Sequence, residues 1–540
     1  MSTPVNPFDR AIELASTLSP AMRWPAKDAD EAELVETVLQ SVRPWASSNI
    51  DSSAIDAASA IPKSILSQAA EQGLFGLSIP ERFGGAGLSM SATSRVVEEI
   101  ACFDRSVATA IGLHCGLGTR GLIHHAHEAL QQRYLPDMAA GTKLGAFAAT
   151  EAGAGSHIAS VKCTGIQGED GKIRLNGEKI YVTNGGFAQV FTVVAKTPGL
   201  AGARNGWSIF ALDRNQPGLS IGREEHKLGI KGSSTITLLL DDVAVDPERI
   251  IGEPSQGLAA FHEILAWGRT MMAGGCVGTA RAAFRLAVSQ ATTREQFGHR
   301  IARFGMIRRK IADMSARLHA METVQRLVTL LQDLYQADIG SESSVAKIFN
   351  SEGSWQVADD ALQVHGGLGY IEETGVARML RDARITRIFE GANEVLRFNL
   401  SSLTLSMKPT TPAALLPAIK TEALHTMAGR YDALSAQLVD GAAALRKQYG
   451  MKVFEQQVLL EGLADGLIAR MVWLSVLLRA DGEFDRLSAK AKGLRQLQLE
   501  YIADWATAQM ERASKVAEWS ERQRLVHALS DAEYELLNSL

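Results

Sequence analysis

Four short stretches of the sequence combine residue types that could do chemistry. The first, AFAATEAGAGSHIAS at residues 146–160, sets glycines beside hydroxyl side chains. Glycine lets backbone N–H groups approach a ligand closely, so this composition suits an oxygen-rich group such as a phosphate or the edge of a flavin ring. A glycine-rich loop that leads into a β domain would have the same composition. The stretch by itself therefore leaves both interpretations open.

The second stretch, YVTNGG at 181–186, is typical of a strand that ends in a turn. Residues two apart on a strand point to the same face, so Tyr181 and Thr183 could form a wall with one hydrogen-bonding group. An ordinary strand with its hairpin turn explains the same residues.

The third stretch, TTREQFGHRI at 292–301, is typical of a helix exit, and its polar and aromatic residues beside glycine are Arg294, Gln296 and Phe297. An arginine there suits a pyrophosphate through paired hydrogen bonds, and a solvated arginine is the simpler alternative.

The fourth stretch, residues 363–397, reads QVHGGLGYIEETGVARMLRDARITRIFEGANEVLR. HGGLG has the glycine density for close approach of the backbone to a ligand, but it lacks the strand-then-helix context of a dinucleotide-binding fingerprint. His365 is typical of a packed or capping histidine, and no histidine or carboxylate near it has the spacing of a metal site. The sequence contains neither a GxSxG elbow nor a P-loop. We therefore predict no metal.

Glu390, near the end of this stretch, raises a separate question. It lies between an aromatic residue and a glycine, in a segment otherwise apolar enough to be buried and with helical surroundings. A lone glutamate is by default a solvated surface residue. A buried carboxylate at this position would need a reason that the rest of the chain must supply.

The composition limits the classes of protein to which such a site could belong. A chain of 540 residues is too long for one core, so we expect three or four domain-sized units. The net charge of −5 leaves no electrostatic footprint for nucleic acid or for an anionic membrane. The four cysteines have neither disulfide nor zinc spacing, which indicates packed thiols in a reducing compartment.

No targeting or membrane segment is evident. The N-terminal residues carry Asp9 and Glu13 and lack a basic region followed by an apolar core, so we expect neither a secretory signal nor a transit peptide and predict a cytoplasmic location. The longest apolar stretch, 457–479, is interrupted by charged residues, which indicates an amphipathic or buried helix and not a membrane span. Nothing supports peripheral contact with a membrane.

The hydrophobic period changes along the chain and predicts four domains. Within the first domain, 1–143, apolar residues recur at helical spacing from about residue 30. Short β-rich runs with NG, NGG, PG and DD turn signals fill 144–255, and helical spacing returns over 256–404. Long helices are expected at 257–291, 305–337, 343–365 and 375–404. We therefore predict a multidomain α+β fold: an N-terminal helical domain, a small central β-barrel or sandwich, a helical bundle, and an extra C-terminal helical domain at 405–540.

The order of these motifs resembles that of the acyl-CoA dehydrogenase family of flavoenzymes. TEAGAGS, YVTNGG, REQFG, QVHGGLG and FEGANEVLR follow one another in family order, and the resemblance covers residues from about 60 to 400. The C-terminal helices, with FEQQVLLEGLADG, resemble the extension of the very-long-chain subgroup. The resemblance implies an FAD-dependent oxidoreductase that oxidises a fatty acyl-CoA to a trans-2-enoyl-CoA, as in β-oxidation.

The resemblance also implies a role for Glu390, which matches the family's catalytic base. The base removes the proton α to the thioester while the β hydrogen leaves as hydride to flavin N5. A carboxylate in an apolar cleft has its pKa raised toward the working pH, as a general base needs. The main-chain N–H of the glutamate and a ribityl hydroxyl of FAD stabilise the thioester oxygen. Glu394, four residues on and expected on a similar helical face, is interpreted as a flavin-side or solvated residue.

The other site residues are carried over from the family's motifs position by position. The expected FAD contacts are Phe147, Ala149, Thr150, Ser156, Tyr181, Thr183, Arg294, Gln296, Phe297, Gln363, Gly366, Gly367, Ala392 and Glu394. The expected contacts with the acyl-CoA substrate are Ser156, Arg269 and Gly391. The resemblance further implies an electron-transfer flavoprotein as acceptor and a homodimer, in which the REQFG residues reach FAD across the interface.

Four residues depart from the family pattern. Tyr181 replaces a tryptophan, His157 an aspartate, Ala392 a hydroxyl residue and Ala266 a frequent Asp or Asn. We expect these changes to affect affinity or substrate preference more than reaction type. Two other readings stay open: an acyl-CoA oxidase that uses oxygen, and a nucleic-acid-binding relative with marginal activity, which the balanced charge of 404–540 disfavours. The length and branching of the acyl chain are not determined by the sequence.

Overall fold

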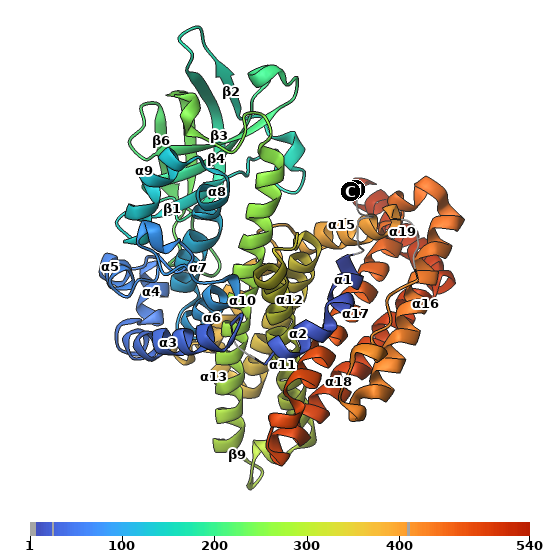
Figure 1. Cartoon of the computed structure of the whole chain (residues 1–540). Helices are drawn as coiled ribbons and strands as arrows, with labels where there is room; N and C mark the ends of the chain where they lie inside the picture. Colours follow the sequence, from blue (N-terminus) through green and yellow to red (C-terminus); the bar gives the residue numbers. More distant parts are fainter. Residues whose placement is uncertain (1–6, 24–25, 408–410, 540) are drawn as a thin grey trace. The chain divides into compact units, whose positions relative to one another are not determined.

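The computed structural model describes residues 7–23, 26–407 and 411–539 and divides into two compact units (Figure 1). Of the described residues, the larger unit contains 26–314 and 332–391, and the smaller unit contains 7–23, 315–331, 392–407 and 411–539. The long helix α11 (Gly305–Tyr335) contributes residues to both. The chain passes from the larger to the smaller unit directly after Gly391, beside Glu390.

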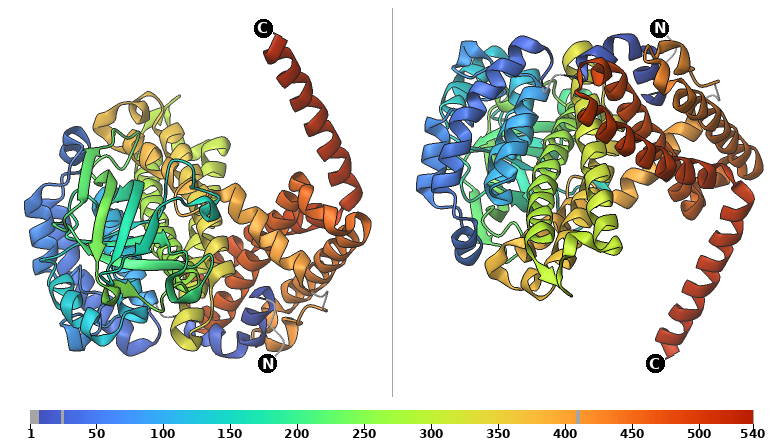
Figure 2. Two further views of the ribbon diagram at one scale, coloured as in Figure 1. Left: turned by 90° about the horizontal axis from the view of Figure 1, so that it is seen from above. Right: turned by 90° about the horizontal axis from the view of Figure 1, so that it is seen from below.

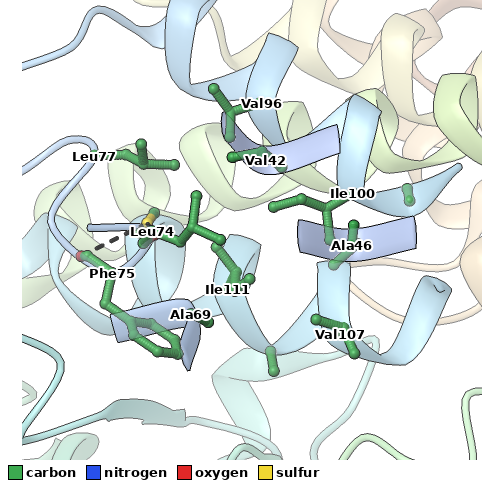
Figure 3. Packing of buried hydrophobic residues seen from close by; sticks show 14 of the residues in the cluster. Val42, Ala46, Ala69, Leu74, Phe75, Leu77, Val96, Ile100, Val107 and Ile111 are labelled. Carbon is green, nitrogen blue, oxygen red and sulfur yellow. Dashed lines mark hydrogen bonds between the residues drawn. The ribbon is translucent and has the colours of Figure 1, made fainter. Parts of the chain in front are cut away.

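Helices α3 to α9 form the first part of the larger unit. They are α3 (Ala29–Asn49), α4 (Ser52–Ala58), α5 (Lys63–Glu71), α6 (Met90–Ala101), α7 (Arg105–Leu113), α8 (Arg120–His125) and α9 (Glu128–Ala139). The side chain of Asp104 caps α7 by accepting the Val107 N–H. Buried aliphatic residues of α3, α5, α6 and α7 pack together, among them Val42, Val96 and Ile111 (Figure 3). This core holds α7 in place.

The β domain is one open sheet. Its strands are β1 (Gly145–Ala148), β2 (Thr164–Gln167), β3 (Ile173–Thr183), β4 (Val190–Lys196), β5 (Trp207–Asp213), β6 (Leu219–Glu224), β7 (Thr235–Val245) and β8 (Ile250–Ile251). The order is β6-β7-β3-β2-β4-β5-β8, with β1 beside β4. Because β6 and β8 end the sheet without pairing to each other, the described strands form no closed barrel. The green strands lie beside the blue N-terminal helices of the same unit (Figure 2).

One turn signal of the sequence is instead a bulge. Asn176 and Gly177 lie inside β3, where the register with β7 shifts between Leu175 and Gly177 and Gly177 has a φ of 148°. A glycine inside a strand often marks such an irregularity because it tolerates dihedrals that other residues avoid. The strand therefore continues through the NG pair to Thr183.

The second helical part of the larger unit is built on α10 (Gly257–Thr293) and α12 (Gly340–His365). The C-cap of α10 is Arg294, followed by the two-stranded ribbon of β9 (Glu295–Gln296) and β10 (His299–Arg300). Small residues along α10 let its neighbours approach closely; a Cβ on Gly278 would come within 2.0 Å of the Glu98 carbonyl oxygen of α6. Helices α13 (Gly367–Tyr370) and α14 (Val376–Arg384) follow α12.

The continuous helix expected over 375–404 is wrong. Helix α14 ends at Arg384, a short 3-10 helix η8 (Ile385–Arg387) follows, and α15 (Asn393–Ser406) begins only after a turn. Within the turn Glu390 has a φ of 56° and Gly391 a φ of 99°. Two successive residues with left-handed backbone cannot continue a right-handed helix, so the chain breaks at the carboxylate.

The described residues of the smaller unit form helices and connecting loops, with no strand. Besides α15 it contains α1 (Pro7–Glu13), α2 (Ala15–Ala21), α16 (His425–Tyr449), α17 (Gln457–Glu483), α18 (Ala489–Ser514) and α19 (Val516–Ser539). Helix α17, drawn from the apolar stretch 457–479, is almost entirely buried, and its Arg470 pairs with Asp9 and donates to Ser435. Helix α19 extends away from the other helices of this unit (Figure 2). Across the described residues, no helix is both long and apolar enough to span a bilayer.

Candidate active site

The carboxylate of Glu390 lies against the backbone of α10. Its Oε2 is buried and has no hydrogen-bond partner, and a Cβ built on Gly268 would come within 2.8 Å of it. Glycine at 268 therefore leaves the space that the carboxylate occupies. A buried polar atom without a partner costs stability, and left-handed backbone at a non-glycine residue costs more. Both costs fall on Glu390, as is typical of a functional residue.

Three cations from three helices act electrostatically on this carboxylate. Arg269 of α10 donates from Nε to the Glu390 carbonyl oxygen at 3.0 Å, and Lys347 of α12 donates from Nζ to the Gly391 carbonyl oxygen at 2.7 Å. Arg105 of α7 is buried over Gly275 and donates to the Met272 carbonyl oxygen at 3.2 Å. Residues seven apart share a helix face, so Gly268 and Gly275 set Glu390 and Arg105 on one side of α10, about 10 Å apart along its axis.

The electrostatics of this cluster favour a base that works near neutral pH. Burial raises the pKa of Glu390 to about 7, and the positive charges of Arg269, Lys347 and Arg105 limit that rise. Burial also lowers the pKa of Lys347 to about 8. Neither Lys347 nor Arg105 belongs to a motif singled out from the sequence. The sequence feature that could have identified Lys347 is its position as a lone cation among the small and apolar residues of one helix, SSVAKIF.

A distorted helical segment faces the same side of α10. Residues His114–Gly118 form a π-helix, η2, directly after α7. The Leu117 side chain reaches Gly268, and Gly116 faces Trp267 and Met271. A π-helix is rare and often marks a functional site. Ala266, which departs from the family pattern, is buried in the same stretch of α10.

Glu394 does not share a helix face with Glu390. Ala392 is the N-cap of α15, Glu394 lies exposed in the first helical turn, and Glu390 precedes the helix in left-handed conformation. The expectation of a similar helical face is therefore wrong, because it assumed that the helix continued through the glycine. An acidic residue in the first turn is favoured by the helix dipole, which gives Glu394 a local structural role.

The structure brings the first two motifs together. The Ile180 N–H donates to the Thr150 carbonyl oxygen at 2.9 Å, and buried Lys179 donates to the Ala149 carbonyl oxygen at 3.0 Å and to Glu151 at 2.8 Å. Phe147 and Ala149 are buried, whereas Ser156 is exposed. Tyr181 and Thr183 therefore extend from a backbone that is fixed to the TEAGAGS loop.

Comparison with known proteins agrees with this arrangement. Models of the N-terminal, middle and C-terminal domains of acyl-CoA dehydrogenase match residues 32–142, 146–243 and 255–402. A mitochondrial very-long-chain specific acyl-CoA dehydrogenase from Macaca fascicularis is 33% identical over 489 residues, which cover 84% of this chain and 75% of that protein. An acyl-CoA dehydrogenase from Bacillus subtilis is 36% identical over 64% of this chain and 90% of its own length.

A solved structure is similar over nearly the whole chain. It is an acyl-CoA dehydrogenase complexed with FAD from Bacillus anthracis, which is 28% identical and has a TM-score of 0.77, covering 95% of this chain and 88% of that chain. The domain matches and the identity to relatives decide the family. The chain belongs to the acyl-CoA dehydrogenase family. It is an oxidoreductase of the acyl-CoA dehydrogenase type, and the family's cofactor is FAD.

The residues of this acyl-CoA dehydrogenase fit FAD. Tyr181, with a φ of 56°, leaves 63% of its surface exposed, and Phe297 leaves 89% exposed. A Cβ built on Gly153, Gly155, Gly366 or Gly367 would meet no atom within 4 Å. Uncovered aromatic rings and open glycine backbone suit a large flat cofactor that carries phosphates.

The remaining predicted FAD residues lie on open surface. Gln296 and Phe297 are exposed on the β9–β10 ribbon, Arg294 is exposed directly before it, and Gln363, Gly366 and Gly367 are exposed at the end of α12. Among the predicted substrate residues, Arg269 and Gly391 meet at the Glu390 turn, and Ser156 lies apart in the exposed loop of the β domain.

Proposed function

We propose that this enzyme dehydrogenates a fatty acyl-CoA to a trans-2-enoyl-CoA with Glu390 as the base. The bond between the α carbon and its hydrogen breaks, and the proton passes to the Glu390 carboxylate. The electron pair left behind forms the new double bond as the β hydrogen departs with its own electron pair. FAD, when bound, supplies the acceptor for that hydride.

One observation carries this proposal: the buried, unpartnered Oε2 of Glu390 at a strained turn. A carboxylate held for structure would be satisfied by hydrogen bonds or an ion pair. This oxygen has neither, while the cations near it are engaged with main-chain carbonyl oxygens. Its raised pKa keeps it basic enough to take a proton from a weak carbon acid.

The left-handed turn also suits stabilisation of the substrate's oxygen. As the α proton leaves, the thioester oxygen gains negative charge and needs hydrogen-bond donors. We assign the Glu390 main-chain N–H as one donor. This N–H belongs to the turn, where Glu390 has a φ of 56° and the two following carbonyl oxygens accept from Arg269 and Lys347. Gly391 adds no side chain, which leaves room for the thioester.

The binding groups divide between two regions. We assign the flavin ring and ribityl chain to Phe147, Ala149, Thr150, Ser156, Tyr181, Thr183, Ala392 and Glu394, and the adenosine diphosphate part to Arg294, Gln296, Phe297, Gln363, Gly366 and Gly367. Ser156, Arg269 and Gly391 would contact the acyl-CoA. Arg269 would then both contact the acyl-CoA and hold the turn, since its Nε already donates to the Glu390 carbonyl oxygen.

The test is anaerobic reduction of the FAD-loaded protein by saturated acyl-CoA thioesters of four to twenty carbons, with branched and aromatic members included. We expect the visible flavin absorbance to disappear with at least one of them and an equivalent of the 2-enoyl-CoA to form. A flavin that none of these thioesters reduces would refute the proposal. Electron-transfer flavoprotein is the proposed acceptor, and fast aerobic turnover to peroxide would instead assign an oxidase.

A further inference from the structure

Lys347 is a buried cation that the proposed reaction does not explain. It lies in the middle of α12, with none of its surface exposed. Burying an ammonium group is costly unless it is paired and hydrogen-bonded. Its Nζ donates to the Gly391 carbonyl oxygen at 2.7 Å, one residue beyond the base. A lysine buried only for packing would be replaced at less cost by an apolar residue of similar size.

The contact completes a pair of supports for the turn. Arg269, from α10, holds the Glu390 carbonyl oxygen, and Lys347, from α12, holds the next one. Charge-assisted bonds of this kind are stronger than neutral ones. The two successive peptide planes that follow Glu390 are thereby fixed on either side of Gly391, directly after the left-handed backbone at Glu390.

We propose that Lys347 is a positioning residue for the reaction, which fixes the Glu390–Gly391 turn and supplies a positive charge beside the base. This inference rests on the proposed function. Because the turn is strained, loss of one support lets the carboxylate and the Glu390 N–H leave the geometry that proton transfer requires. A small displacement of catalytic groups is enough to slow a reaction by orders of magnitude.

The charge of Lys347 acts on the base together with its neighbours. The ionisable groups around it are Glu390 in the turn, Arg269 and Cys276 on α10, Glu352 on α12 and, near Glu390, Arg105 on α7. A nearby cation favours the ionised carboxylate, so its removal raises the pKa of Glu390. Arg269 and Arg105 remain in a Lys347 variant, so the rise should be partial.

The experiment compares Lys347→Met with the control Lys227→Met. Methionine keeps the length and apolar stem of the lysine and removes its charge and its donor. Lys227 is a half-buried lysine of the β domain whose Nζ also donates to a main-chain carbonyl oxygen, that of Ser233 at 2.8 Å. The control therefore removes the same type of bond far along the chain from the Glu390 turn.

Two readouts separate proton transfer from folding and binding. The first is the limiting rate of anaerobic flavin reduction from pH 6 to 9, with the acyl-CoA that reduces the wild type fastest. The second is deuterium uptake from D2O at the α carbon of bound 3-thiaoctanoyl-CoA, whose sulfur at the β position has no hydride to give. This second readout reports the base alone. FAD content and thermal unfolding check the fold, and Lys347→Gln serves if Lys347→Met does not bind FAD.

We expect Lys347→Met to lower both rates by at least about tenfold at pH 7 and to move the apparent pKa of reduction upward, while the dissociation constant of the analogue changes less than about threefold. Lys227→Met should match the wild type. Unchanged rates, a lower rate with no movement of the pH profile, or loss of FAD in both Lys347 variants would each overturn the inference. A wild type that no acyl-CoA reduces refutes the proposed function itself, which distinguishes the two failures.

Discussion

At the scale of the residue, Glu390 combines features that are rare together. It has left-handed backbone, a buried oxygen without a partner, and a pKa raised to about 7 by burial. Each feature costs stability, and each suits the proposed role of Glu390 as a base that accepts a proton near neutral pH. Glu394, exposed in the first turn of α15, has none of them.

Glu390→Gln tests the base directly. The amide keeps the shape of the side chain and the main-chain donor, so acyl-CoA should still bind, but flavin reduction should fall by at least about 10³-fold. The matched variant Glu394→Gln should stay within about tenfold of the wild type. Stopped-flow reduction under anaerobic conditions measures both. Fast reduction in Glu390→Gln together with slow reduction in Glu394→Gln would show that Glu394, and not Glu390, is the base.

The raised pKa of Glu390 predicts a pH dependence with a definite sign. Below about pH 7 the carboxyl is mostly protonated and cannot accept the α proton, so the limiting reduction rate should rise about tenfold per pH unit and level off above about pH 7. In the unfolded chain the same carboxyl ionises near its usual pKa. The folded state therefore loses stability as pH rises from that value to about 7.

The stability part of this prediction has its own measurement. Glu390→Gln removes the buried charge, so its melting temperature should exceed that of the wild type at pH 8, and the difference should shrink toward pH 5. Calorimetry of FAD-loaded protein at both pH values tests this. Equal melting temperatures at pH 8 would mean that the carboxylate is not destabilised by burial.

At the scale of the element, α10 sets the site because its glycines let groups from other segments approach. Gly268 admits the Glu390 carboxylate and Leu117, and Gly275 admits the Arg105 guanidinium. The three groups come from the turn after η8, the π-helix η2 and the start of α7. A helix with ordinary side chains at these positions would separate these elements.

Gly268→Ala should therefore lower the rate of flavin reduction, although it adds only one methyl group. The added Cβ would lie 2.4 Å from Leu117 Cδ2 and 2.8 Å from Glu390 Oε2, so the carboxylate must move. We expect flavin reduction to fall at least about tenfold and overpacking to cost about 1–3 kcal/mol.

Gly429→Ala in α16 is the control for Gly268→Ala. A Cβ at Gly429 meets no atom within 4 Å, so alanine should leave the reduction rate unchanged and stabilise the helix slightly. Stopped-flow reduction and thermal melting of both variants give the comparison. Wild-type reduction by Gly268→Ala would show that the carboxylate does not need this space.

At the scale of the whole molecule, the exposure of three predicted FAD residues favours assembly. Gln296 and Phe297 lie on the β9–β10 ribbon, Arg294 directly precedes it, and Phe297 leaves 89% of its surface exposed. A large uncovered aromatic side chain is typical of a binding surface. We propose that this ribbon contacts the FAD of a second copy of the chain in a homodimer.

Light scattering of the FAD-loaded protein should give the mass of a dimer. Arg294→Ala should weaken FAD binding at least about tenfold, since a charge-assisted bond to the diphosphate is lost, with little change in the reduction rate once FAD is saturating. Isothermal titration of the FAD-free protein measures the affinity. A stable FAD-loaded monomer would refute the shared site.

Much of this protein was determined by the sequence itself. Hydrophobic periodicity depends only on neighbouring residues, so it could be used to predict three features of the chain. These are the change from helical to β spacing near 144, its reversal near 256 and the apolar helix within 457–479. The family followed from motif order, and Glu390 followed from the family. Predictions from local patterns were wrong where the backbone conformation depends on distant contacts. Asn176–Gly177 forms a bulge and not a turn, because β7 pairs with β3 on both sides of it. The helix expected through Glu390 is interrupted there.

Only the tertiary structure decided what surrounds the carboxylate. Lys347, Arg269 and Arg105 lie far apart along the chain, and no spacing links them to Glu390. They come near one another because α7 and α12 both pack against α10, which brings these buried charges close to one strained turn. The pKa of Glu390 depends on that burial and on those charges, which act through space and not along the sequence.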